Sequence, residues 1–359
     1  MIVQKKKLSE IFLIFTFAMV FLNSLVLPLI YFHRLNLFPD GKTVILFSVE
    51  LIANKTNYAF DFLRKAIEKN SDGESEVYED KPDKNKEESS ASEKHAEDKS
   101  YDNNVNVIEK FYQGGGKKVG NFYVKNISGR YVDFERYLNK KLDMRCRDSK
   151  LPMVLIYHTH TTESYLTQNT KKTGDNSYFR TQDKNQNVIA VGKKIKEALE
   201  ESGVVVVHSE DFHDYPNYNV AYQKSKSTVE EKLKSNPNIQ FAIDIHRDSI
   251  GNNRTGKIKP ICKIGGKNVS QIMLITGILC KKWAENLTLA LKIQSLCEKM
   301  FPGLTRPLLF ARTNYNQNVT ARSILIEIGS DVNTLEESLS AGEKLGKAMA
   351  ELIKSYRKR

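Results

Sequence analysis

The chain is poor in cysteine: it has four in 359 residues, and none lies in a Cys-x-x-Cys pair. This spacing argues against a cysteine-rich zinc module and against a disulfide-dense secreted fold. One disulfide remains open, but buried free thiols are the expected state of Cys146, Cys262, Cys280 and Cys297. No nucleic-acid-binding motif is present and the lysines are scattered, so we expect no nucleic-acid partner. The net charge of +12 instead favours anionic lipid headgroups or an acidic cell-wall polymer.

The N-terminal region contains a run of about 22 residues without charge, Ile11–Phe32. This length is sufficient for a helix to cross the hydrocarbon core of a bilayer. A cleaved signal peptide is the alternative, but the run exceeds a usual signal-peptide core and no A-x-A site follows. We therefore predict an uncleaved anchor at 11–32. Lys5, Lys6 and Lys7 keep residues 1–10 in the cytoplasm and place the rest of the chain outside.

Composition divides the rest of the chain into three parts. Residues 33–70 include an apolar-periodic stretch, which predicts a membrane-proximal helical stalk. Residues 71–104 are rich in Glu, Lys, Ser and Asp and have few large apolar side chains, which predicts a disordered charged linker. Residues 105–359 are expected to form the folded catalytic domain.

Strand-like and helix-like segments alternate in that domain. Apolar runs predict strands at 122–128, 153–157, 204–208, 241–245, 271–277 and 323–326. Helical periodicity predicts helices at 130–142, 188–202, 219–235, 285–300 and 335–356. The alternation indicates an α/β domain whose mainly parallel or mixed sheet is flanked by helices.

Three of the predicted strands end in residues suited to metal chemistry. Strand 153–157 runs into the sequence His158-Thr159-His160, with Glu163 just beyond, and two other strands lead to His246 and Glu327. If these strands are parallel neighbours, the residues meet in the crevice at the carboxyl edge of the sheet. Imidazole and carboxylate are the ligands of hydrolytic zinc sites. The pattern therefore predicts a zinc site.

The roles divide between metal ligands and a proton carrier. His158, His160, Glu163 and His246 are the candidate ligands of Zn²⁺, and spacing alone does not decide between His158 and His160. Glu327 ends an otherwise aliphatic strand, where a carboxylate requires a partner or a function. We assign it the role of catalytic base.

Five ordered blocks make the chain resemble the stage II sporulation protein P family of membrane-anchored cell-wall hydrolases. They are LIYHTHTTESY, FAIDIHRDS, WAENLTLALKI, FPGLTRP and SILIEIGSDVNTLEES, and they span roughly 151–354. The domain is in turn similar to zinc-dependent N-acetylmuramoyl-L-alanine amidases. Carried over from their motifs, the resemblance implies that His160 and His246 are zinc ligands and that Glu327 is the catalytic glutamate.

The chain departs from the amidase pattern at the third ligand. Those enzymes place a metal-binding glutamate at the start of the helix after the first loop, where this chain has Asn185-Gln186-Asn187-Val188. Glu163 is one candidate for the missing ligand, and an asparagine acting with water is the other. Arg247, Arg306 and Asn318 are candidates for binding the peptide stem, with loop salt bridges as the alternative role.

The resemblance implies cleavage of the amide between muramic acid and L-alanine, and of D,D-crosslinks between stem peptides. It also implies partnership with a lytic transglycosylase and a membrane scaffold, in the septal membrane of the mother cell, while the wall is thinned during engulfment. Two other functions stay open: a non-catalytic wall-binding module of the same fold, and a zinc carboxypeptidase.

Overall fold

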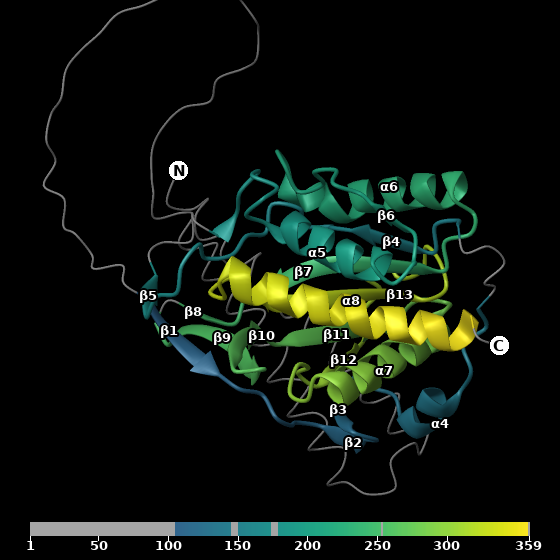
Figure 1. Cartoon of the computed structure of the whole chain (residues 1–359), viewed down its shortest axis with the longest axis horizontal. Coiled ribbons are helices and arrows are strands. Elements are labelled where there is room, and N and C mark those ends of the chain that lie inside the picture. The colour runs from purple at the N-terminus through teal and green to yellow at the C-terminus, as the bar shows by residue number, and fades with distance from the viewer. Residues whose placement is uncertain (1–104, 145–149, 174–178, 253, 358–359) are drawn as a thin grey trace, which may run out of the picture. The chain divides into compact units, whose positions relative to one another are not determined.

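The computed structural model describes residues 105–144, 150–173, 179–252 and 254–357 (Figure 1). All of them fall within the unit Glu97–Arg359. The expected anchor, stalk and linker lie outside the described residues. Within the described part of the chain, no helix is both long and apolar enough to span a membrane.

An eight-stranded mixed sheet forms the centre of the described domain (Figure 1). Its strands run in the order β2 (Lys117–Val119), β3 (Phe122–Ile127), β12 (Leu308–Ala311), β11 (Ile272–Gly277), β13 (Ser323–Ser330), β7 (Phe241–Asp248), β4 (Val154–Tyr157) and β6 (Val206–His208). Only the β2–β3 and β11–β13 pairs of this order are antiparallel. The expected α/β fold with a mixed sheet flanked by helices is therefore confirmed.

A smaller sheet was not expected from the sequence. It runs in the order β10 (Lys267–Ser270), β9 (Gly256–Ile264), β1 (Val105–Lys110) and β5 (Lys172–Thr173), with β8 (Gly251–Asn252) also on β9. Three lysines interrupt the apolar pattern of β9, and two of them are buried. Lys259 nevertheless lies buried, with its Nζ 2.6 Å from Glu337 Oε1, and Lys257 Nζ lies 2.8 Å from Asp331 Oδ2. Partners distant in sequence thus make these charges compatible with a covered strand.

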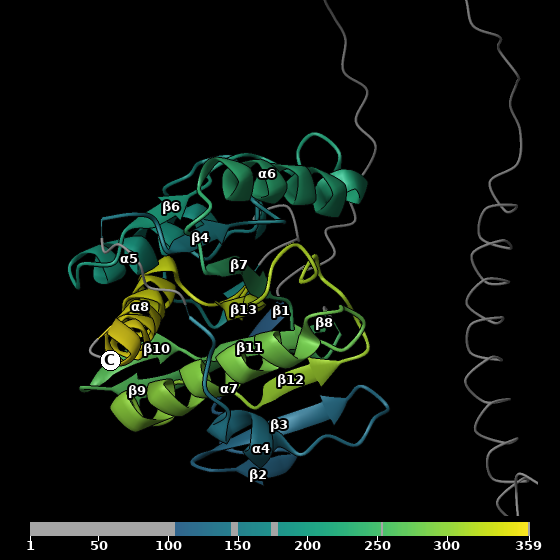
Figure 2. The ribbon, with the colours of Figure 1, turned by 90° about the vertical axis from the view of Figure 1, so that its right-hand side faces the viewer.

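Helices cover both faces of the larger sheet (Figure 2). The core on one face involves α5 (Val188–Glu200), α7 (Trp283–Met300) and α8 (Leu335–Arg357), while α6 (Ala221–Ser235) packs on the other. A short helix, α4 (Phe134–Asn139), lies beside α7, and the turn η3 (Tyr218–Val220) precedes α6. Along β4, Val154 and Ile156 join the first core and Leu155 and Tyr157 the second. This alternation follows from the two-residue period of a strand.

Helices α5 and α8 of the first core pack closely (Figure 1). Gly342 and Gly346 of α8 face α5, and a Cβ added at Gly346 would lie 2.7 Å from Ala198 Cβ and 2.8 Å from Ile195 O. The two glycines, four residues apart, fall on one side of the helix. Their missing side chains allow the close approach of the two backbones.

Strands β4, β7 and β13 are adjacent and parallel, as the site hypothesis requires. The structure extends β7 to Asp248 and β13 to Ser330, beyond their predicted ends. His246 and Glu327 therefore lie inside the strands, where they are direct register partners. Partners in adjacent strands point to the same face, so the imidazole and the carboxylate lie side by side.

A register shift between Glu327 and Ser330 interrupts the pairing of β13 with β7. Gly329, at the centre of the shift, has a φ of +65°. A Cβ at this position would lie 2.8 Å from Asn333 Oδ1, which itself accepts a hydrogen bond from Ser330 N. Such irregularities redirect side chains near functional sites. Here the irregularity begins directly after Glu327.

We predict that Gly329→Ala lowers the free energy of unfolding by about 2–4 kcal/mol, because it adds a steric clash to the cost of a left-handed alanine. Gly265→Ala is the matched control: its φ is +59°, and no described atom lies within 4 Å of its Cβ position. The control should lose only about 1–2 kcal/mol. Urea unfolding with an unchanged m-value measures both losses. Equal losses would show that the contacts around Gly329 relax freely.

Candidate active site

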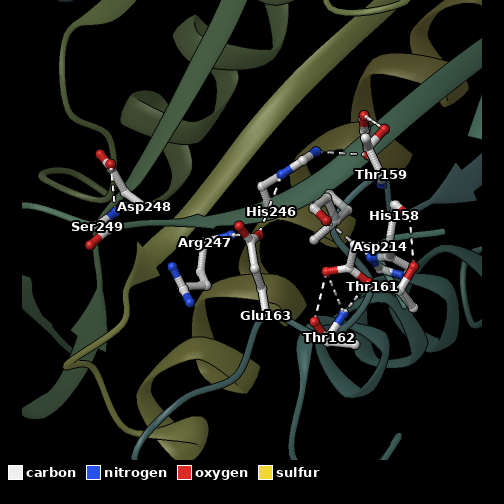
Figure 3. Close-up of polar contacts among 12 residues, drawn as sticks. His158, Thr159, Thr161, Thr162, Glu163, Asp214, His246, Arg247, Asp248 and Ser249 are labelled. Atoms are coloured by element: carbon white, nitrogen blue, oxygen red, sulfur yellow. Dashed lines mark hydrogen bonds and ion pairs between the residues drawn. The ribbon is translucent and has the colours of Figure 1, made fainter. Parts of the chain in front are cut away.

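A buried polar network holds the loop that follows β4 (Figure 3). Thr162 donates its N–H to Asp214 at 3.1 Å and its hydroxyl at 2.7 Å. Arg180 Nη1 donates to the same carboxylate at 2.7 Å, and Thr161 Oγ1 donates to the His158 carbonyl at 2.9 Å. These bonds fix the path of the loop between His158 and Glu163.

The fixed loop forms one wall of a pocket of about 310 Å³ at the carboxyl edge of the three parallel strands. Five of the predicted site residues, His160, Glu163, His246, Arg247 and Glu327, line it together. The remaining lining residues are Arg180, Tyr218, Tyr222, Asp248, Ser249, Ile275, Tyr315 and Leu325. Residues up to 167 positions apart in sequence thus meet in one place, as the strand-end pattern predicts.

His160 lies among aromatic rings. It stacks on Tyr218 with ring centroids 4.5 Å apart, and it meets His246 edge to face at 5.3 Å. Its Nδ1 is buried and has no hydrogen-bond partner among the described residues. Burial lowers the pKa of the ring, which favours the neutral form that binds metals.

His246 lies between two carboxylates (Figure 3). Its Nδ1 is 3.4 Å from Glu163 Oε2, and its Nε2 is 3.0 Å from Asp244 Oδ1, although the Nε2–H direction is not aligned for a hydrogen bond. Burial alone would lower the pKa of His246, but Asp244 and Glu163 raise it well above its ordinary value. A carboxylate behind an imidazole is the usual support of a metal-binding histidine.

Glu163 is buried and strongly anionic. Its Oε2 accepts the backbone N–H of Arg247 at 3.1 Å, and its Oε1 lies 3.8 Å from Arg180 Nη2. Burial alone would raise the pKa of this carboxyl, but Arg247, His246 and His160 outweigh burial and bring it to about 2. Glu163 is therefore a permanently charged carboxylate in the pocket.

Glu327 differs from Glu163 in its surroundings. Its Oε2 is buried and has no hydrogen-bond partner in the described part of the chain. Burial raises the pKa of its carboxyl to about 8, with the negative charges of Asp248 and Glu163 adding to the effect against His246 and Arg306. The two carboxylates of the pocket thus differ widely in pKa. Such a difference distinguishes a group that exchanges protons from one that stays ionised.

The structure does not place His158 in this pocket. The ring is fully buried, with Nδ1 3.0 Å from Ile245 O and Nε2 2.8 Å from His208 Nε2. Burial and the neighbouring His208 lower its pKa to about 3. Gly192 makes room for the pair, since a Cβ there would lie 2.6 Å from His208 Nε2. The backbone turns directly after β4, so the strand alternation that suggested a shared face for His158 and His160 does not hold.

The substrate-binding candidates fall in three different places. Arg247 is buried and donates to Ser164 O at 3.3 Å and to Phe179 O at 2.8 Å, so its guanidinium ties the first loop to β7. Asn318 is exposed and is absent from the pocket lining. Arg306 pairs with Asp248 at 2.9 Å beside the pocket. Of the three, Arg247 lines the pocket and Arg306 lies beside it, so both remain candidates for contacting a ligand.

Some residues of the site, in the pocket or directly behind it, were not found from the sequence. Asp244 precedes His246 by two positions in a strand, so both side chains lie on one face, and this spacing is the signal that identifies it. Tyr218, Tyr222 and Tyr315 come from η3, α6 and the segment after β12, and no motif marks them. Tyr315 has a φ of +46°, an uncommon conformation for a bulky residue.

The pocket residues fit a zinc ion by chemistry. Two imidazoles and one ionised carboxylate match a common catalytic zinc ligand set, and the buried His160 Nδ1 has no hydrogen-bond partner in the described part of the chain. No three His, Cys, Asp or Glu side chains within the described ranges converge as a ready ligand group. His246 and Glu163 contact each other instead. Asn187 does not replace Glu163, because its side chain caps α5 and donates to Thr181 O.

Comparison with solved structures finds amidases. The N-acetylmuramoyl-L-alanine amidase AmiC2 of Nostoc punctiforme is 18% identical, covers 58% of this chain and 98% of its own, and has a TM-score of 0.35. The CwlD amidase of Clostridioides difficile, solved in complex with the GerS lipoprotein, is 17% identical, covers 57% and 98%, and has a TM-score of 0.37. Both TM-scores lie below 0.5, so family membership rests on the sequence matches.

The sequence matches point to one family. The stage II sporulation protein P of Bacillus subtilis (strain 168) is 32% identical over 212 residues, which cover 56% of this chain and 51% of that protein. The chain thus aligns with about half the length of this relative. A family model described as Stage II sporulation protein P (SpoIIP) matches residues 40–353, far more than half of the chain. The chain therefore belongs to the stage II sporulation protein P family.

Proposed function

We propose that the chain is a zinc-dependent peptidoglycan hydrolase that cleaves the amide between N-acetylmuramic acid and L-alanine. The observation that supports it best is the pocket in which His160, Glu163 and His246 lie beside Glu327, whose Oε2 is buried and has no hydrogen-bond partner among the described residues. Membership of a sporulation family and the basic net charge of +12 agree with action on an anionic cell wall. Cleavage of D,D-crosslinks between stem peptides is a second amide hydrolysis that the same residues can serve.

Zinc would be held by His160, Glu163 and His246. Asp244 would fix the orientation of His246 from behind, since its carboxylate faces Nε2 and leaves Nδ1 to the pocket. When bound, Zn²⁺ supplies a Lewis acid that polarises an amide carbonyl and makes a water molecule more acidic. Glu163 contributes negative charge at every working pH, because its pKa is about 2.

Glu327 would carry the proton. Its ionised Oε2 accepts a proton from the attacking water while the new C–O bond forms, and it returns that proton to the amide nitrogen as the C–N bond breaks. The pKa of about 8 places the carboxyl near the pH of the reaction, where proton exchange in both directions is efficient. The positive charge of a metal ion in the pocket would favour the ionised form of Glu327, with which the cycle begins.

The cellular setting is also part of the proposal. We infer that Ile11–Phe32 anchors the chain in the septal membrane of the mother cell, with the catalytic domain on the outer side. A lytic transglycosylase and a membrane scaffold are the proposed partners during engulfment. Glycan-strand cleavage by the transglycosylase and amide cleavage by this chain would open different bonds of the same polymer.

We predict that Glu327→Gln lowers amide cleavage by about 10²–10⁴-fold, because glutamine cannot accept a proton. The full chain in detergent is incubated with zinc and purified peptidoglycan, and released fragments are identified by mass spectrometry. Stem peptides with a free L-alanine amine are the expected product. Glu336→Gln, the same change at an exposed residue of α8, should leave their release unchanged. Wall binding without any release would indicate a non-catalytic module, and release of D-alanine alone would indicate a carboxypeptidase.

A second prediction separates the two histidines of the first loop. His160→Ala should abolish stoichiometric zinc binding, as measured by metal analysis after dialysis. His158→Ala should keep zinc but lower the free energy of unfolding by about 1–3 kcal/mol, because it leaves His208 without its buried partner. The opposite result, zinc lost in His158→Ala and retained in His160→Ala, would show that His158 and not His160 is the zinc ligand.

A further inference from the structure

A second and larger cavity, of about 940 Å³, adjoins the proposed catalytic pocket. The two share Asp248 and Ser249 at the end of β7. In Figure 3, these two residues lie on the far side of Arg247 from His246. This volume lies at the upper end of the range for sites that hold drug-sized ligands. The smaller pocket has room for the reacting groups, whereas the larger cavity has room for an extended part of a substrate.

The ionisable lining of this cavity is mainly cationic. Lys117 of β2, Lys125 of β3 and Arg306 line it, and Asp248 is the one carboxylate among the described residues of the lining. Both lysines are exposed, while Asp248 is already paired with Arg306 Nη1 at 2.9 Å. The free charges of the cavity are therefore positive, which favours an anionic ligand.

Arg306 is the residue with unmet hydrogen-bonding capacity. The side chain is buried, at 5% exposure, and its Nε and Nη2 have no hydrogen-bond partner among the described residues. A buried donor without an acceptor costs about 1–3 kcal/mol, and more when it is charged. A planar guanidinium matches the two oxygens of a carboxylate, which would remove this cost.

We propose that the larger cavity binds the stem peptide of the substrate, with Arg306, Lys117 and Lys125 contacting its carboxylates. This inference rests on the proposed function, because it takes the scissile amide to lie in the pocket at Glu327. The glycan then lies on the side of Tyr218 and Tyr315, and the peptide runs past Asp248 and Ser249 into the cavity. Recognition of peptide carboxylates would thus position the amide for cleavage.

The test compares two ligands that differ only in charge. A synthetic N-acetylmuramoyl pentapeptide with free carboxylates, and the same compound with every carboxylate converted to a carboxamide, are titrated calorimetrically into the full chain. The Glu327→Gln background prevents turnover. We expect the free acid to bind about tenfold or more tightly than the amide, as for loss of hydrogen bonds between charged groups. Arg306→Gln should remove most of this preference.

Exposed lysines provide variants whose folding is not at risk. Lys117→Ala combined with Lys125→Ala should reduce the preference for the acid about two- to fivefold. The control combines Lys118→Ala with Lys263→Ala, which removes the same charge from exposed positions outside the cavity lining, and it should leave the preference unchanged. Equal binding of acid and amide overturns the inference even if the chain cleaves peptidoglycan. A preference that depends on Arg306 supports it even if cleavage fails.

Discussion

The carboxylate of Asp244 is buried between the strands that carry the candidate site. It accepts two hydrogen bonds from Thr159, from the N–H at 2.8 Å and from the hydroxyl at 2.6 Å, and it faces His246 Nε2 on its own strand. Burial would raise the pKa of Asp244, but His246 and Thr159 keep it below its ordinary value, so the group stays charged. A buried charge of this kind persists only with its partners in place. The start of the first loop and the orientation of His246 therefore depend on one another.

Much of the site followed from the sequence because strand ends are easy to recognise. An aliphatic run that stops at a His or Glu residue marks a strand end in the sequence, and parallel neighbours bring such ends together at one edge of the sheet. This reasoning placed His160, Glu163, His246 and Glu327 in one pocket, although it rested on a parallel order of β4, β7 and β13 that only the structure supplies. Helices α5 to α8 followed from apolar periodicity for the same reason: burial of one face leaves a regular pattern.

The remaining features depend on contacts that no local pattern encodes. Strand β9 was not predicted, because Lys257 and Lys259 interrupt its apolar pattern and their buried partners lie more than 70 residues away in sequence. His158 and His160 differ only in which way the backbone turns after β4, and that turn is set by Asp214 and Asp244. The tyrosines of the pocket come from three separate segments. Each of these features becomes visible only once tertiary pairing is known.

The parallel pairing of β7 with β13 also makes the pocket sensitive to alignment. Glu327 and His246 are register partners, and their strand neighbours Ile245 and Ile326 point to the opposite face. A slip of one residue in either strand would exchange a polar pocket residue for a buried isoleucine. A chain with every residue of the site present but one strand misaligned would therefore look folded by its secondary structure and still be inert. Activity at this pocket is therefore a stricter test of correct folding than the helix and sheet content measured by spectroscopy.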